Sequence, residues 1–152
     1  MHLLGGSLPN IETKKDETVK NLITSVSPII KDFQRPALSA ESQVIHPTLN
    51  YVGYFDALTY HAKSESIVLI DWKTTEKTKT TLKSTFDAPL QVAAYVGALN
   101  HDARYPYQVE NALVVVVNKN GNPAKVFKMG KILLRNYWLH WINRCLQYQT
   151  MS

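Results

Sequence analysis

The sequence Ile67-Val68-Leu69-Ile70-Asp71-Trp72-Lys73-Thr74 places one acid and, two residues later, one lysine in an apolar run rich in β-branched residues. Such a run predicts a buried β-strand, whose side chains alternate between its two faces. Asp71 and Lys73 should therefore emerge on one face and Trp72 on the other. A buried carboxylate and ammonium group are costly to desolvate unless they are paired or have a chemical role. This strand is the first candidate for a functional site.

Phosphodiester hydrolysis would give the pair such a role. The acid can hold a divalent metal ion, and the lysine can stabilise developing charge or prepare a water nucleophile. The alternative is a structural module in which Asp71 and Lys73 only neutralise each other. We interpret the rest of the chain as the scaffold and the completion of this pair.

The composition is that of a folded protein with a moderate basic bias. The 152 residues suffice for one domain with a proper core, and 45% hydrophobic with 19% charged residues excludes wholesale disorder. The 17 basic and 12 acidic side chains give a net charge of +5, which permits a nucleic-acid partner without requiring one. The single cysteine, Cys145, excludes an intrachain disulfide and a cysteine-ligated zinc site. No apolar run approaches membrane-spanning length.

Hydrophobic periodicity predicts an α/β domain with a mixed sheet flanked by helices. We expect poor order over residues 1–12, and then a helix, a kink and a short second helix, because Ser27-Pro28 is typical of a helix start. Three strands joined by short turns should form an antiparallel meander, and a later Val-rich strand should be buried on both faces. The expected elements are helices over 16–33, 87–101 and 131–149 and strands over 41–46, 51–60, 67–74, 107–117 and 124–128.

Three further features accompany the acid–lysine strand. Asp56 follows Gly53 in the preceding strand, and a glycine within a strand marks a close backbone approach or a bulge. Gln91 and Tyr95 are four apart, so they share one face near the start of a helix. Glu41 begins the first strand, either as a supporting acid or as an ordinary polar residue on a sheet edge.

Two further segments could either contact nucleic acid or have a purely structural role: the last helix and the connector after the acid–lysine strand. Trp138 and Trp141 could stack on bases, but their helical spacing among apolar residues favours a stripe that packs on the core. The connector is either a solvated loop or a loop that tracks phosphates with three lysines. These are Lys77, Lys79 and Lys83.

A Gly-x-x-Asp strand, an Asp-x-Lys strand and a Gln-x-x-x-Tyr helix follow one another in this order. Each motif arises by chance in many proteins, but the three together, each on the expected element, are a strong signal. The residues are Gly53-Tyr54-Phe55-Asp56, Asp71-Trp72-Lys73 and Gln91-Val92-Ala93-Ala94-Tyr95. The chain thereby resembles the RecB-like exonuclease branch of the PD-(D/E)XK nuclease superfamily. That resemblance implies a restriction-endonuclease-like fold and a metal-dependent nuclease.

Longer stretches, from about Glu41 to the C-terminus, resemble the family of mitochondrial genome maintenance exonucleases. This resemblance implies an exonuclease that trims free ends of single-stranded DNA in mitochondria, and we expect a monomer without a membrane partner. In that family a helical part and a presequence precede this region, so we expect a single nuclease domain over 1–152 that lacks the helical part. The stretches are Leu49-Asn50-Tyr51-Val52-Gly53, Ile70-Asp71-Trp72-Lys73-Thr74, Ser84-Thr85-Phe86-Asp87-Ala88-Pro89-Leu90-Gln91-Val92 and Asn100-His101-Asp102.

The resemblance also implies roles for the residues of the motifs. Asp56 and Asp71 would bind Mg²⁺ or Mn²⁺ together with the backbone carbonyl of Trp72, and Lys73 would position the attacking water. A metal-site histidine lies at the end of the family's N-terminal part, and His2 is its candidate here, although the glycines after it are unlike a helix.

The remaining motif residues have supporting roles under the same resemblance. Gln91 and Tyr95 would orient Lys73 or contact the DNA backbone, and Glu41 would be a supporting acid near the metal. A catalytically impaired remnant that only binds single-stranded nucleic acid is the alternative to an active nuclease.

Overall fold

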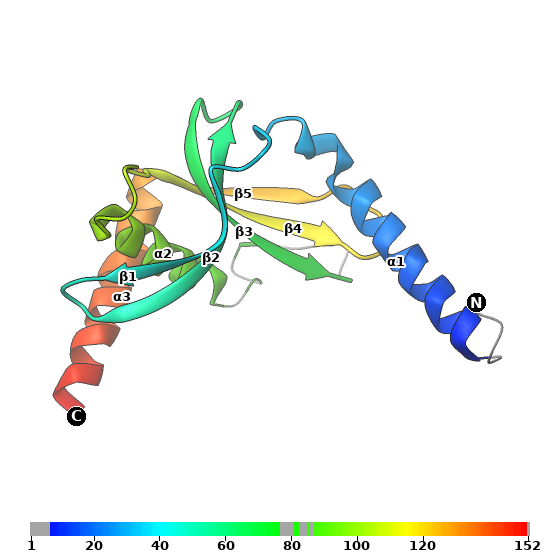
Figure 1. Ribbon diagram of the computed structural model, residues 1–152. Coiled ribbons are helices and arrows are strands. Elements are labelled where there is room, and N and C mark those ends of the chain that lie inside the picture. Colours follow the sequence, from blue (N-terminus) through cyan, green and yellow to red (C-terminus); the bar gives the residue numbers. More distant parts are fainter. Residues whose placement is uncertain (1–6, 77–80, 83–84, 86, 152) are drawn as a thin grey trace.

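The computed structural model describes residues 7–76, 81, 82, 85 and 87–151, with side chains from Lys15 onward within these ranges. The helices and strands follow one another along the chain in the predicted order (Figure 1). The elements are α1 (Ser7–Ile30), β1 (Ser39–His46), β2 (Tyr51–His61), β3 (Ser66–Thr75), α2 (Ala88–His101), β4 (Asn111–Asn118), β5 (Lys125–Met129) and α3 (Lys131–Met151).

The described strands form one sheet in the order β1-β2-β3-β4-β5. β2 pairs antiparallel with both β1 and β3, β3 and β4 are parallel, and β5 returns antiparallel to β4. The chain passes from β3 to β4 through α2, which is the usual way to join parallel neighbours. The predicted meander and the mixed sheet flanked by helices are confirmed.

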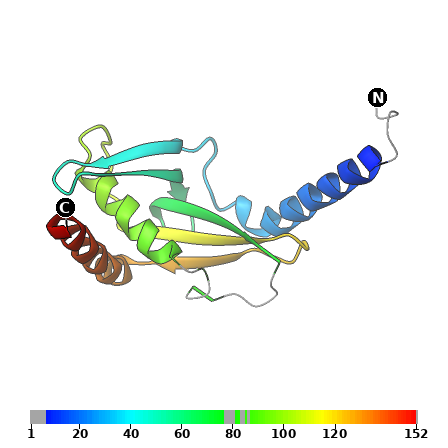
Figure 2. The same cartoon turned by 90° about the horizontal axis from the view of Figure 1, so that it is seen from below.

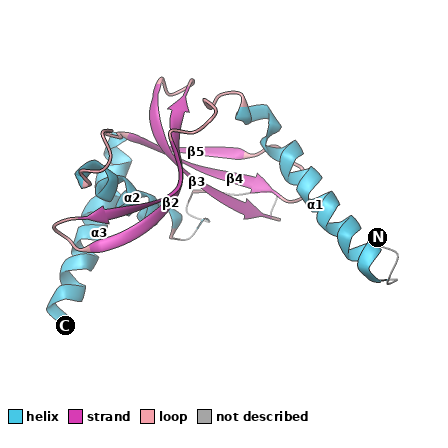
Figure 3. Ribbon diagram, viewed as in Figure 1, coloured by secondary structure: helices cyan, strands magenta, loops and turns pink. Residues whose placement is uncertain are grey.

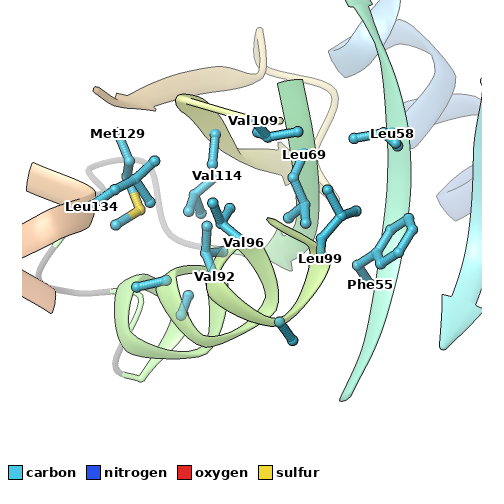
Figure 4. Packing of buried hydrophobic residues seen from close by; sticks show 14 of the residues in the cluster. Phe55, Leu58, Leu69, Val92, Val96, Leu99, Val109, Val114, Met129 and Leu134 are labelled. Carbon is cyan, nitrogen blue, oxygen red and sulfur yellow. The ribbon is translucent and has the colours of Figure 1, made fainter. Parts of the chain in front are cut away.

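Helices cover both faces of the sheet, as Figures 2 and 3 show. α2 packs on one face with α3 beside it, and Val92, Val96 and Leu99 of α2 meet Leu69 of β3 and Val114 of β4 (Figure 4). The C-terminal half of α1 packs on the other face. Because both faces are covered, β3 and β4 are buried and apolar through the middle of the sheet.

The first helix differs from the prediction at both described ends. It begins at Ser7, within the region where we expected poor order, and it runs to Ile30 with Pro28 inside it. The Ser27 hydroxyl donates a hydrogen bond to the Ile23 carbonyl, so it does not cap a second helix. The predicted short second helix is therefore wrong. Pro28 lies in the last turn, so the one intrahelical bond that its missing N–H removes, to the Thr24 carbonyl, lies close to the helix end.

Helix α3 meets α2 through an aromatic contact. Gly97 of α2 lies under the Trp138 ring, and a Cβ at this position would lie 2.1 Å from it. Trp138 is therefore a packing residue, as predicted. The rest of the expected apolar stripe is only partly covered, because Leu134 is the one buried residue among the described residues of α3. No helix in the described ranges is long and apolar enough to cross a membrane.

Candidate active site

The sheet divides at the position of the two motif acids. β2 pairs with β3 from His61 back to Ala57, which lies opposite Ile70, and beyond this point β2 pairs with β1 alone among the described strands. Asp56 and Asp71 are the first residues past the last β2–β3 pair. Figure 1 shows the β1–β2 hairpin turning away from β3 there. A strand that parts from its neighbour leaves room for side chains between the two backbones.

Asp56 spans the gap with its side chain. One of its carboxylate oxygens, Oδ2, accepts a hydrogen bond of 2.8 Å from the Trp72 N–H. The bond lies where backbone pairing between β2 and β3 has ended, so it ties the two strands together and fixes the direction of the carboxylate. The Trp72 ring takes the opposite face of β3 and packs edge-on against Phe33, as strand alternation predicts.

Asp71 and Lys73 lie on one face of β3, as predicted, with Nζ of Lys73 3.3 Å from Oδ2 of Asp71. The Asp71 side chain is 8% exposed, whereas that of Lys73 is 37% exposed. Oδ2 of Asp71 is buried and makes no hydrogen bond within the described part of the chain. A carboxylate oxygen in this condition is uncommon, because buried charges are normally both paired and hydrogen-bonded.

The pKa of Asp71 is raised above its ordinary value. Burial is the largest cause, and the negative charge of Asp56 adds to it, while the Lys73 ammonium acts in the opposite direction. The ion pair with Lys73 therefore compensates the buried charge only in part. A further cation beside the two acids would stabilise both ionised carboxylates.

The Gln-x-x-x-Tyr motif meets the Gly-x-x-Asp motif beside these acids. The Tyr95 ring lies against Gly53, where a Cβ would come within 2.6 Å of it, so only glycine allows this approach. The pKa of Tyr95 is raised by burial and then by the charges of Asp71 and Asp56. Gln91, one turn earlier on α2, lines the same hollow as Gly53 and Tyr95. The three motifs thus converge on one site.

Comparison with known proteins agrees with this convergence. Residues 12–147 match the profile of the PD-(D/E)XK nuclease superfamily. The chain belongs to this superfamily. The match extends over every described element of the sheet and α2, and it includes Asp56, Asp71 and Lys73.

Similar curated proteins are named mitochondrial genome maintenance exonuclease 1. The one from Homo sapiens is 44% identical over 138 residues, which are 89% of this chain and 39% of that protein. The one from Mus musculus is 40% identical over 133 residues, 87% of this chain and 36% of that protein. The one from Xenopus tropicalis is 36% identical over 143 residues, 94% of this chain and 40% of that protein. The chain spans about two-fifths of the length of these relatives.

Nucleases of this superfamily typically use divalent metal ions. The two acids at the point where β2 parts from β3, Asp56 and Asp71, fit such an ion. Mg²⁺ and Mn²⁺ take oxygen ligands, and Mg²⁺ keeps several waters, so one or two carboxylates suffice. Asp71 supplies a buried oxygen without a hydrogen bond, and Asp56 supplies a second carboxylate that is held in place. No cluster of three His, Cys, Asp or Glu side chains occurs in the described ranges, so these two acids are the candidate side-chain ligands.

Among the predicted site residues not yet placed, Glu41 is the one that the structure describes. In register Glu41 faces Asp56, since Ala40 pairs with Ala57 and Ser42 with Phe55, but Glu41 itself is unpaired and exposed with a φ of 47°. Its supporting role stays a prediction. Four candidates lie outside the described residues: His2, Lys77, Lys79 and Lys83.

Two residues of α3 that the sequence analysis did not assign to the site lie at its border. Trp141, which we assigned to the core, is only half-buried and lines the hollow of Gln91 and Tyr95 together with Arg144. Arg144 follows Trp141 by three positions and is therefore its neighbour on the helix surface. This spacing is the sequence signal that could have identified the two residues. A cation next to an aromatic residue on the apolar face of a helix is not needed for core packing.

Proposed function

We propose that this chain is a metal-dependent exonuclease that hydrolyses phosphodiester bonds of single-stranded DNA at free ends and acts in mitochondrial DNA maintenance. The observation that carries the proposal is the buried Oδ2 of Asp71, which has a raised carboxyl pKa and an incomplete set of partners beside Asp56 and Lys73. Superfamily membership supports a nuclease, and the names of the relatives support the mitochondrial setting.

Asp56 and Asp71 would hold a divalent ion, with the Trp72 carbonyl as the predicted further ligand. When bound, such an ion polarises the scissile phosphate and lowers the pKa of a bound water. Asp71 must then be ionised, which its buried position disfavours in the ion's absence. Asp56 keeps its orientation through the Trp72 N–H, so the two carboxylates do not have to reorganise when substrate arrives.

Lys73 would act at the exposed side of the pair. Its ammonium group has three N–H donors, and its side chain is 37% exposed although it pairs with Asp71. These donors can hydrogen-bond the attacking water and a non-bridging phosphate oxygen, so that charge developing on the phosphate is offset. The Tyr95 hydroxyl is protonated near neutral pH, as tyrosines ordinarily are, and the raised pKa strengthens this, so it is available as a hydrogen-bond donor.

The test is cleavage of an end-labelled single-stranded oligonucleotide with Mn²⁺, with Mg²⁺ or with EDTA. The proposal predicts metal-dependent shortening that Lys73→Ala reduces by at least about a hundredfold. Lys63→Ala is the matched control, because Lys63 is 73% exposed and pairs with Asp32 away from the site. A closed circular single strand and a blunt duplex test the requirement for a free single-stranded end.

Two results would contradict the proposal. Cleavage that persists in Lys73→Ala, or that Lys63→Ala reduces equally, would remove Lys73 from the mechanism. Folded wild-type protein that binds single strands without cutting them under any metal would favour the impaired remnant instead.

A further inference from the structure

A hollow of about 380 Å³ lies beside the unpaired edge of β2, and three motif residues, Gly53, Gln91 and Tyr95, line it. One wall is residues 51–54 of β2, which pair with β1 but with no strand on the other side within the described chain. The opposite wall is the first two turns of α2, including Gln91 and Tyr95. From Tyr51 to Asp56 this edge measures roughly 16 Å at about 3.3 Å per residue, which is longer than one nucleotide.

The end of this hollow is formed by α3 and carries a cation. Trp141 packs edge-on against Tyr51 with ring centroids 5.1 Å apart, and this pair forms an aromatic wall. Arg144 lies one turn further along α3, is exposed, and lines this hollow and the two hollows that adjoin it. A ligand that extends from the motif residues Gln91 and Tyr95 through this hollow would therefore meet the part of α3 that carries Arg144.

The charge of Arg144 is not neutralised in the described part of the chain. No described carboxylate lies within 4.0 Å of it, in contrast to Arg104, which pairs with Asp102 at 2.7 Å. Asp87 also lines the hollow and makes the local charge less positive, but it forms no ion pair with Arg144. A planar guanidinium suits a phosphate, because it can donate two parallel N–H bonds to two oxygens.

We propose that Arg144 binds a backbone phosphate of the substrate strand, at a nucleotide that is removed from the scissile bond and occupies the hollow lined by β2, α2 and α3. The proposal rests on the proposed function for the identity of the ligand, a single nucleic-acid strand. Arg144 is a positioning residue in this account, because it touches the strand without reaching the reacting atoms. The Trp141–Tyr51 wall supports the strand beside it, in the manner of aromatic residues that accompany cations in single-strand grooves.

The test is equilibrium binding of a fluorescent single-stranded oligothymidylate in EDTA over a series of KCl concentrations. Arg144→Gln should weaken binding on the order of tenfold and lower the slope of log affinity against log salt by about 0.7, the value for one phosphate contact on a single strand. Arg144→Lys should keep most of the slope, because it keeps the charge.

Arg135→Gln is the matched control. Arg135 is exposed on the same helix, and its loss changes the net charge equally, but it lines a separate hollow that contains none of Asp56, Asp71, Lys73, Gln91 and Tyr95. Binding and salt slope should be those of the wild type. Equal effects of Arg135→Gln and Arg144→Gln, or no change of slope in Arg144→Gln, would overturn the proposal.

The outcome is separable from the fate of the proposed function, because binding in EDTA does not require cleavage. Metal-dependent cleavage with an unchanged slope in Arg144→Gln would retain the nuclease and reject this contact. An Arg144-dependent slope without cleavage would retain the contact and reject the nuclease. Arg144→Gln that lowers the melting temperature with an unchanged slope would show a purely structural arginine.

Discussion

Two acid–base pairs in this chain have the same spacing and opposite surroundings. Asp71 and Lys73 are two residues apart, as are Asp102 and Arg104, and both carboxylates are less than one-tenth exposed. Asp102 accepts bonds from the Ile45 N–H, from the Arg104 N–H and from the Arg104 guanidinium. Asp71 has a single ion pair at 3.3 Å and a buried Oδ2 without a hydrogen bond in the described chain.

The pKa values of the two carboxyls move in opposite directions. Hydrogen bonds from Arg104 are the main reason that the pKa of Asp102 lies far below its usual range, whereas burial raises that of Asp71. A satisfied pair holds two elements together, here the end of α2 and strand β1. An incompletely satisfied pair is costly to fold and is expected where a ligand completes it. The comparison therefore separates a structural pair from a functional one.

The largest expected effect is on catalysis. Asp71→Asn keeps the size of the side chain and removes its charge, so oligonucleotide cleavage should fall by at least about a hundredfold. Asp102→Asn should leave cleavage per folded molecule within about twofold, because Asp102 does not face the two acids. Initial rates at saturating Mn²⁺, corrected for the folded fraction, would measure both. Similar losses of cleavage in the two variants would contradict the assignment of Asp71 as functional and Asp102 as structural.

The second largest expected effect is on stability, and it concerns the Asp102–Arg104 pair. Asp102→Asn removes a charged acceptor of several bonds and should cost about 2 kcal/mol of unfolding free energy, or about 6 °C in melting temperature. Asp71→Asn should change the metal-free protein by less than about 1 kcal/mol, because its buried charge is poorly compensated. Urea unfolding in EDTA measures both. A larger loss for Asp71→Asn would mean that its ion pair is structural.

A smaller effect is the pH dependence of stability. The pKa of Asp102 is lowered by folding, so its contribution is complete above its unfolded value of about 4 and declines as the pH falls below it. The difference in unfolding free energy between wild type and Asp102→Asn should therefore shrink below about pH 4. The contribution of Asp71 has the opposite sign, since a raised pKa means that the folded chain binds the proton first. Urea titrations in EDTA at several pH values test both signs.

Local patterns were sufficient for much of the fold. The apolar run before Asp71 and the Val-rich run of β4 predicted buried strands, because such runs are stable only between two covered faces. The convergence of Asp56, Asp71 and Lys73 also followed from motif order and strand alternation. Pro28 misled the prediction, because a proline in the last turn of a helix and one at a helix start look alike in sequence.

What the sequence could not supply was how each charged group is surrounded. Asp102 and Asp71 have the same spacing to their cations. Only the fold brings the Ile45 N–H to Asp102 and leaves Oδ2 of Asp71 without a hydrogen bond from the described residues. The parting of β2 from β3 is likewise a property of the whole sheet, and it creates both the site and the hollow that Arg144 borders.

The most direct test of the central claim is the melting temperature of the protein in EDTA and in excess Mn²⁺. An ion that binds only the folded chain stabilises it by about 2.7 kcal/mol at a hundred times its dissociation constant, which corresponds to roughly 8 °C here. We expect the melting temperature to rise in excess Mn²⁺ for the wild type and for Asp102→Asn, and not to rise for Asp71→Asn. No rise in the wild type, or a full rise in Asp71→Asn, would contradict a metal site built on the incompletely satisfied carboxylate.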